Sequence, residues 1–346
     1  MAGKTSLYAT QLRWGLTRRN RSYARGRAHL ESYGSAPVIV YEPEGGRHGN
    51  FFDEAYAAIL ARPEWMRRFD KVHAQAARSL PKPQSDIARR WRELDSSMSS
   101  DALLMNVFCT PGVAESPAVR AMLGVGDGAE LIFGAEPIFG AEPIFGWKAR
   151  VPLANGRFDR TEVDLRFGSL LAEAKLTEAD FQSRSAAIVE SYRDFDEVFD
   201  RDRLPRTEIA TTRWMTASEF PENASQELES VVGDPALFSP VESNFRSPGE
   251  EGYAGYQLIR NVLAAHAAGS SFCVIHDQRR PDLREAWFDV MAAVKSAELR
   301  VRLKVLTWQE LTALLPGALQ EFLDRKYGIV APGKTPSPIE DADLSL

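Results

Sequence analysis

Apolar and polar positions alternate along two short runs that meet at Gly168-Ser169, in the segment RTEVDLRFGSLLAEAKL (160–176). Alternation with a period of two is typical of β-strands, and Gly168-Ser169 is typical of a tight turn. The segment therefore predicts a hairpin of two strands. The face that carries Ala172, Ala174 and Leu176 is apolar and is expected to be buried.

The predicted hairpin brings three charged side chains together. With Gly168 and Ser169 as the loop, Asp164 lies directly across from Glu173, and the period of two puts Lys175 on the same face as Glu173. Two carboxylates at facing positions repel each other, because their Cβ atoms are roughly 5 Å apart. A fold keeps such a pair most readily when a divalent cation lies between the carboxylates.

Helical spacing of apolar residues dominates the first third of the chain. Residues 51–80 predict two helices, the second opened by Pro63 at its first turn. A further helix is expected over 85–94, and SSMSSDALLMNVF predicts a serine-capped helix that ends near Cys109. A short helix follows at 116–123.

A β pattern occupies the middle of the chain. Residues 147–153, the turn residues Asn155-Gly156 and the hairpin together predict a three-stranded meander. A helix is then expected over 177–199, and residues 200–250 are polar and irregular.

The last third predicts helix and strand in alternation. Residues 252–269 form a predicted helix that ends at Gly269, and residues 270–315 read as strand, helix, strand and capped helix. This series favours an α/β fold with a mixed central sheet flanked by helices. On the 252–269 helix, one face next to the apolar stripe carries Gln257, Arg260, Asn261 and Ala264.

The hexapeptide IFGAEP occurs twice in succession, at 132–137 and 138–143. Two copies are too few for a solenoid. The repeat therefore predicts a small tandem duplication in an enlarged loop or an extended edge, because loops tolerate insertions at little cost.

Composition narrows the class of protein. The chain has 346 residues, a net charge of −6 and two cysteines that lie in apolar runs, Cys109 and Cys273. Free buried thiols in a reducing cytosol are the simplest interpretation. No run of about 18 apolar residues occurs and the N-terminus lacks a secretory pattern, so we expect a cytoplasmic protein without a membrane span.

Positive charge is concentrated in the basic arm, residues 1–30, which carry seven Lys and Arg residues and no acidic residue. Arg18, Arg19 and Arg21 lie close to Trp14 and Tyr23, a mixture that suits contacts with phosphates and stacked bases. The alternative is a flexible basic tail with no specific partner.

The charged residues of the hairpin suit phosphodiester hydrolysis. Asp164 and Glu173 would hold Mg²⁺ or Mn²⁺, which prefer oxygen ligands, and Lys175 would position the attacking water or neutralise the transition state. Gln257 would hydrogen-bond the water or a ligand, and Arg260 would contact a phosphate oxygen. The alternative is that the three hairpin residues lie on a solvated face and have no catalytic role.

Asp164, the triplet Glu173-Ala174-Lys175 and the later run YQLIRN (256–261) resemble the PD-(D/E)XK nuclease superfamily, in particular its uncharacterised bacterial restriction-endonuclease-like branch. The resemblance implies a mixed sheet flanked by helices and Mg²⁺-dependent DNA cleavage. It also implies metal ligation by Asp164 and Glu173, a catalytic Lys175 and an auxiliary Gln257.

The resemblance spans roughly 95–330 and gives three predicted regions. Residues 1–94 are a basic arm and a helical region, 95–330 the nuclease core, and 331–346 a Pro-rich, acidic tail expected to be disordered. The superfamily's proline is absent, because Val163 precedes Asp164. Members often add a glutamate from an earlier element, for which the chain offers Glu93, Glu115, Glu130, Glu136 and Glu142.

The leading hypothesis is a cytoplasmic, metal-dependent DNA endonuclease of restriction or phage defence. Cutting both strands usually requires two active sites, so a homodimer or a partner protein is expected to assist. One alternative is a catalytically silent nucleic-acid-binding or assembly module on the same fold. Another is a metal-dependent enzyme that acts on a small phosphorylated substrate.

Overall fold

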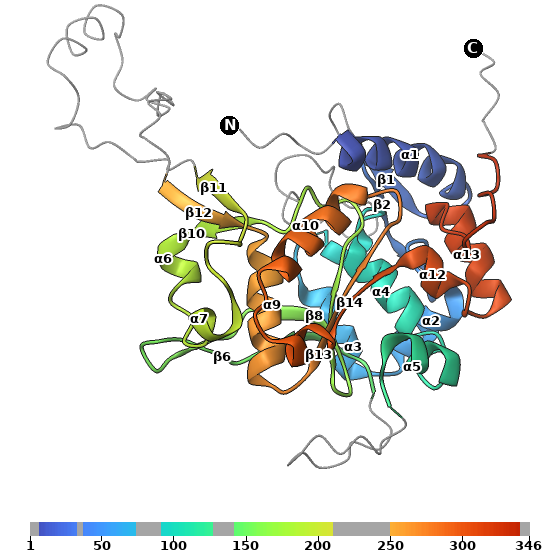
Figure 1. Cartoon of the computed structure of the whole chain (residues 1–346). Helices are drawn as coiled ribbons and strands as arrows, with labels where there is room; N and C mark the ends of the chain where they lie inside the picture. The colour runs from blue at the N-terminus through green and yellow to red at the C-terminus, as the bar shows by residue number, and fades with distance from the viewer. Residues whose placement is uncertain (1–6, 33–36, 74–90, 127–141, 210–249, 340–346) are drawn as a thin grey trace, which may run out of the picture.

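A five-stranded sheet lies at the centre of the protein, with the strand order β14-β13-β9-β8-β5 (Figure 1). The structure, a computed structural model, describes residues 7–32, 37–73, 91–126, 142–209 and 250–339. β13 is parallel to β9 and β14, whereas β8 is antiparallel to β9 and β5. The predicted mixed sheet is therefore confirmed. Its strands are β5 (Ile144–Lys148), β8 (Glu162–Phe167), β9 (Leu170–Ala174), β13 (Ser271–His276) and β14 (Leu303–Thr307).

The predicted hairpin of β8 and β9 has the expected register. Phe167 faces Leu170 and Leu165 faces Ala172, and Gly168 in the turn has a φ of 59°, which favours glycine. The ladder of paired residues ends at Leu165 and Ala172, so Asp164 and Glu173 lie just beyond the last pair.

Helices cover both faces of the sheet (Figure 1). Apolar side chains of α9 (Tyr256–Ala267) and α10 (Pro281–Ala292) pack against one face. Those of α4 (Ser100–Phe108), α12 (Trp308–Thr312) and α13 (Gly317–Tyr327) pack against the other. Burial on both sides explains the continuous apolar run of β13.

The predicted caps are confirmed in α4 and α12, and a third helix, α5 (Pro117–Leu123), has a serine cap that the sequence pattern did not predict. The Ser99 side chain accepts a hydrogen bond from the Ala102 N–H at the start of α4, and Ser116 does the same for α5. Thr307 and Glu310 form a reciprocal capping box that opens α12. Cys109 and Cys273 are buried free thiols, as expected.

The N-terminal elements pack onto this core. α1 (Leu7–Tyr23) lies beside α13 and shares its hydrophobic cluster, and an aromatic cluster joins the segment from Phe51 to Phe69 to α4 (Figure 1). Pro63 opens a helix at its first turn, as predicted. The remaining elements are β1 (His29–Glu31), β2 (Ile39–Tyr41), β3 (Pro43–Glu44), β4 (Arg47–His48), α2 (Asp53–Leu60), α3 (Pro63–Met66), η1 (Arg67–Asp70) and η2 (Glu93–Asp95).

The predicted helix over 177–199 is wrong. The segment contains only β10 (Ser183–Ser185) and two single turns, α6 (Ala186–Val189) and α7 (Phe195–Val198). The cause is tertiary: the fully buried Arg280 guanidinium donates hydrogen bonds to the carbonyls of residues 176, 178 and 179, which a helix would need for itself. Gln182, with a φ of 59°, then turns the chain away.

Two further boundaries differ from the prediction. Residues 250–254 form β12 (Glu250–Ala254), which lies between β10 and β11 (Arg206–Ile209) in a three-stranded sheet, so α9 begins only at Tyr256. Asn155-Gly156 closes a separate ribbon of β6 (Val151–Pro152) and β7 (Phe158–Asp159), and the meander of the main sheet is β5-β8-β9. A single turn, α11 (Ala297–Arg300), precedes β14.

Several predictions fall outside the described residues. They concern most of the IFGAEP repeat, the start of the helix over 85–94, and residues 210–249. Within the predicted tail, Ser337 donates hydrogen bonds from its N–H and hydroxyl to the carboxylate of Asp324 on α13.

Candidate active site

Glu173 is buried at the end of β9 and is bonded through both carboxylate oxygens. Oε1 accepts from Lys175 Nζ at 2.9 Å and from Gln257 Nε2 at 3.0 Å, and Oε2 accepts from Asn261 Nδ2 at 2.8 Å. Only 1% of Glu173 and 4% of Lys175 is exposed. The hairpin face is therefore covered by α9, and the interpretation of these residues as a solvated surface is excluded.

Asp164 occupies the place where the strand ladder opens. Its Oδ2 accepts the Ala174 N–H at 2.8 Å, so a side chain replaces the next main-chain partner of β9. Burial, reinforced by the charges of Glu173 and Asp101, raises the pKa of Asp164 well above its usual value, and Lys175 opposes this only in part. The expected repulsion between facing carboxylates is therefore present.

Lys175 keeps its charge in this surrounding. Burial alone would lower the pKa of Lys175, but Glu173, Glu178 and Asp164 together raise it above its usual value. Trp308 Nε1 donates to the Lys175 carbonyl at 3.0 Å, so α12 fixes the backbone of this residue.

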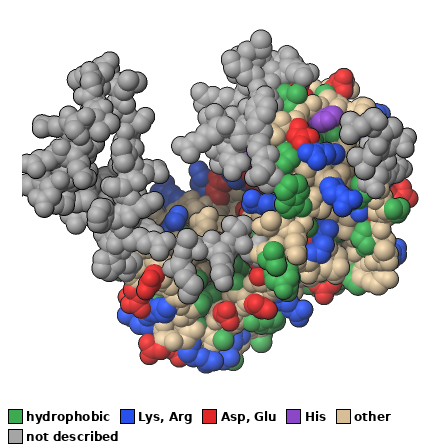
Figure 2. Space-filling view, turned by 90° about the horizontal axis from the view of Figure 1, so that it is seen from above, with side chains coloured by type: hydrophobic (Ala, Val, Ile, Leu, Met, Phe, Trp, Pro, Cys, Tyr) green, Lys and Arg blue, Asp and Glu red, His purple; other side chains and the backbone are tan. Residues whose placement is uncertain are grey.

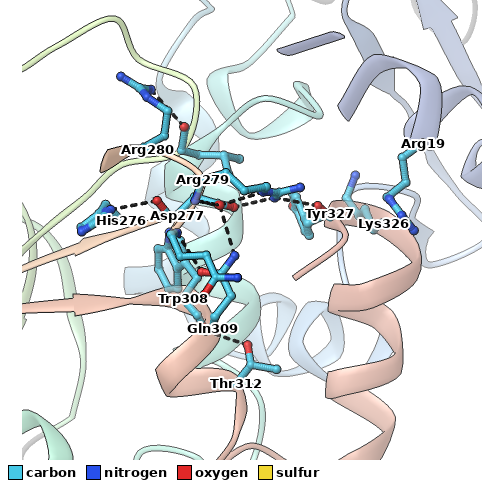
Figure 3. A network of polar contacts seen from close by, with 12 residues as sticks. Arg19, His276, Asp277, Arg279, Arg280, Trp308, Gln309, Thr312, Lys326 and Tyr327 are labelled. Atoms are coloured by element: carbon cyan, nitrogen blue, oxygen red, sulfur yellow. Dashed lines mark hydrogen bonds and ion pairs between the residues drawn. The ribbon is translucent and has the colours of Figure 1, made fainter. Parts of the chain in front are cut away.

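A polar network centred on Asp277 lies directly after β13, beside the end of β9 (Figure 3). Asp277, directly after β13, accepts hydrogen bonds from the side chains of Arg279 and Gln309, and Gln309 also accepts the Gln278 N–H. Gln309 follows Trp308 in α12, so the same helix turn holds Asp277 and the Lys175 carbonyl. The network therefore links α12 to the residue after β13 and to the end of β9.

α9 supplies the polar side chains that meet Glu173. Gly255, with a φ of 71°, ends β12 and lets the helix start at once, so Gln257 and Asn261 project one turn apart toward Glu173. Arg260 is 3% exposed and donates from Nε and Nη2 to Asn261 Oδ1 at 3.1 and 2.8 Å. Nη2 also donates to the Glu162 carbonyl at 2.9 Å. Arg260 therefore orients Asn261 and joins α9 to β8.

Asp164, Glu173, Gln257 and Arg260 line a pocket of about 260 Å³. Both acidic and basic side chains reach this pocket. The charged lining residues are Arg68, Lys71, Glu162, Asp164, Glu173, Arg184 and Arg260.

A family model described as Restriction Endonuclease associating with ARP matches residues 18–328. The chain belongs to this restriction-endonuclease family. No curated protein and no solved structure matches the chain significantly.

The site of this restriction-endonuclease-like chain contains three residues that the sequence did not indicate. Asp101, at the first turn of α4, accepts from Arg68 Nη2 at 2.6 Å and Lys71 Nζ at 3.2 Å. In the sequence, Asp101 is marked only by the serines that precede it, and Arg68 and Lys71 only by their place in a basic run after the helix opened by Pro63. Arg68 and Lys71 line the pocket together with Asp164 and Glu173, and the charge of Asp101 acts on Asp164, so packing between distant segments brings all three to the site.

The five glutamates that could add a further carboxylate to the site lie in different places. Glu93 is partly buried, and burial together with the charges of Asp101 and Glu178 raises its pKa, so it lies in the same acidic surrounding. Glu142 pairs with Arg62 at 2.7 Å, and Glu115 is exposed. Glu130 and Glu136 lie outside the described residues.

Part of the basic arm is attached to the protein itself. Arg19 donates to the carbonyls of Asp324 and Ser337 at 3.0 and 2.9 Å, and Arg21 pairs with Glu31. Arg18 is exposed on α1. In the view of Figure 2, Lys and Arg are mixed with Asp and Glu and do not form a uniform basic face. Contact of Arg18, Arg19 and Arg21 with DNA stays a prediction.

None of the described helices combines the length and the apolar character needed to cross a bilayer. The described residues also contain no cluster of three or more Asp, Glu, His or Cys arranged to hold a metal ion.

Proposed function

We propose that this chain is a divalent-metal-dependent endonuclease that hydrolyses phosphodiester bonds of DNA, in restriction or phage defence. The observation that carries the proposal is the burial of Glu173 and Lys175 beside a second carboxylate, Asp164, in a chain of a restriction-endonuclease family. Like charges are placed together inside a protein at a cost to stability, so their presence supports a functional reason.

The residues of the pocket suit Mg²⁺ or Mn²⁺. The raised pKa of Asp164 means that its ionised form is disfavoured in the folded protein, and a bound cation would favour that form; Glu173 lines the same pocket. Gln257 Oε1 is buried and has no hydrogen-bond partner among the described residues. Two carboxylates and an amide oxygen are hard ligands, and Mg²⁺ usually keeps several waters besides. Asp164 and Glu173 would therefore hold the metal, with Gln257 Oε1 as a further acceptor.

The bound metal would lower the pKa of a water ligand and polarise the phosphodiester. Although burial opposes it, Glu173, Glu178 and Asp164 raise the pKa of Lys175, so Lys175 would supply a positive charge near the charge that develops on phosphorus. Gln257 and Asn261 orient Glu173, and Arg260 acts through Asn261.

The decisive test is cleavage of plasmid and linear DNA with Mg²⁺ or Mn²⁺, with EDTA as the metal-free control. Asp164→Asn keeps an oxygen for the Ala174 N–H but removes the charge, so it should abolish cleavage. Asp289→Asn, at an exposed position of α10, is the matched control and should cleave like the wild type. Cleavage that survives Asp164→Asn would overturn the site.

The family description names association with ARP, and we propose that such a partner acts together with this chain on DNA. If the isolated chain binds DNA and cleaves none with either metal, the assay is repeated with the partner present. Absence of cleavage in both cases would favour a catalytically silent binding module.

A further inference from the structure

The segment after α3 brings two cations to the carboxylate pocket from a region outside the sheet. Trp65 and Phe69 anchor this segment: Trp65 packs edge-on against Phe145 of β5 and donates from Nε1 to the Pro143 carbonyl at 3.1 Å, and Phe69 joins the aromatic cluster around Phe51. Arg68 and Lys71 thereby reach the pocket that Asp164 and Glu173 line.

Arg68 is fixed in place by two acidic residues. Its Nη1 donates to Glu162 Oε2 at 2.9 Å and its Nη2 to Asp101 Oδ2 at 2.6 Å, and only 11% of its side chain is exposed. It lies directly over Gly146 of β5, where an added Cβ would be 2.0 Å from Nη1. Because Gly146 has no side chain, the guanidinium of Arg68 can lie against the backbone of β5.

Lys71 is held on the same acceptor but is more open. Its Nζ donates to Asp101 Oδ2 at 3.2 Å, and 51% of its side chain is exposed. An ammonium has three N–H donors, and this contact uses one of them. Although burial opposes it, Asp101 and Glu93 raise the pKa of Lys71, so the group is charged at neutral pH.

A DNA backbone that approaches this pocket meets two carboxylates before it meets a metal. Repulsion between a phosphodiester and a carboxylate disfavours binding unless cations at the rim compensate for it. Lys175 is buried and engaged with Glu173, and Arg260 is buried and engaged with Asn261. Two of the cations that line the pocket are open to solvent: Arg184, whose guanidinium lies over the Tyr256 ring, and Lys71, which is half-exposed and held by the Asp101 carboxylate. Lys71 therefore combines exposure with a carboxylate that positions its ammonium.

We propose that Lys71, held by Asp101 beside Arg68, contacts a non-bridging phosphate oxygen of the DNA backbone at the mouth of the site. The proposal rests on the nuclease function for its assignment of DNA as the ligand. A half-exposed ion pair contributes little to stability, so removal of Lys71 should leave the fold intact. If Lys71 had only a structural role, its removal would therefore leave the DNA affinity unchanged.

The test is equilibrium binding of a short DNA duplex at several salt concentrations, in a Lys175→Ala background that prevents cleavage. Lys71→Ala should weaken binding about tenfold at low salt and reduce the slope of log K against log salt by about 0.9, the loss of one phosphate contact. Lys295→Ala is the matched control, because Lys295 is exposed and donates to one protein carbonyl outside the pocket. It should change neither quantity.

The outcomes separate this proposal from the nuclease function. Wild-type affinity and slope in Lys71→Ala would overturn the phosphate contact, even in a chain that cleaves DNA. Loss of affinity and slope in Lys71→Ala would support the contact, even if the wild type cleaves nothing. Equal losses in Lys71→Ala and Lys295→Ala would show a nonspecific charge effect and overturn the assignment.

Discussion

Lys175 and Lys326 are both buried, but they lie in opposite surroundings. Lys175 is 4% exposed and faces carboxylates, which raise its pKa. Lys326 on α13 is fully buried; its Nζ donates to Asn20 Oδ1 at 2.8 Å and lies 4.5 Å from the ring centroid of Tyr41. Burial and the charge of Arg27 lower the pKa of Lys326 well below its usual value.

The difference shows what distinguishes a candidate site from a structural contact. Within the described part of the chain, Lys326 has polar and aromatic neighbours and no ion pair with a carboxylate, so its hydrogen bond to Asn20 serves to dock α13 on α1. Lys175 lies where negative charge exceeds positive charge, since Asp164 adds to Glu173. An excess of negative charge favours the binding of a second cation, whereas a neutral aromatic surrounding does not.

The strongest contrast is expected in catalysis. Lys175→Ala should lower the rate of DNA cleavage about 10²–10³-fold, because a charge aimed at the reacting phosphate is lost. Lys326→Met should leave the rate unchanged, and initial rates of plasmid nicking measure both. An equal loss in Lys326→Met would mean that the effect comes from disturbed packing.

Metal binding should next distinguish the acidic surroundings of Lys175 from the aromatic surroundings of Lys326. At a Mg²⁺ concentration 100 times the Kd, the free energy of unfolding should rise by about 2.7 kcal/mol in the wild type and in Lys326→Met. Asp164→Asn should show no such rise, because it removes a proposed ligand. Thermal unfolding with and without Mg²⁺ measures the effect, and a full response in Asp164→Asn would place the metal elsewhere.

In the absence of metal, Asp164→Asn should stabilise the fold by about 0.5–2 kcal/mol at pH 7. The raised pKa of Asp164 means that the folded state favours its protonated form, so ionisation at neutral pH costs stability. The wild type should recover this difference as the pH falls through the folded pKa toward the unfolded value near ~3.9. Urea unfolding at pH 7 and at acidic pH tests it, with Asp289→Asn as the control.

Local patterns predicted the part of the site that local structure builds. The alternation around Gly168 gave the hairpin and its register, because turn and strand preferences act within a few residues. Asp164 and Glu173 follow directly after the last ladder pair and line the same pocket. The polar face of α9 followed equally from helical spacing, and Gln257 and Asn261 both contact Glu173.

The remainder depends on contacts between distant segments. Arg280 is about a hundred residues from the carbonyls it binds, and it overrides the helix that the sequence favours over 177–199. Asp101 and Lys71 carry no local mark of the pocket they share with Asp164. The periodicity of a single sequence does not predict such contacts between distant segments, because they arise only in the packed fold.

The smallest effects concern pH, and here the two lysines should differ in sign. The unfolded pKa of lysine is about 10.4. The folded pKa of Lys175 is higher, so its contribution to stability is present below pH ~10.4 and is lost as the pH rises through the folded value. The folded pKa of Lys326 is lower, so below pH ~10.4 the unfolded state binds more protons and this residue costs stability.

Lys175→Met should therefore be less stable than the wild type at pH 7, by an amount that is lost as the pH rises from ~10.4 through the folded pKa. Lys326→Met should be more stable, by an amount that shrinks as the pH rises toward ~10.4. Urea unfolding at pH 7 and at alkaline pH measures both. Differences of the same sign would show that burial alone, and not the carboxylates around Lys175, decides the cost of a buried cation in this fold.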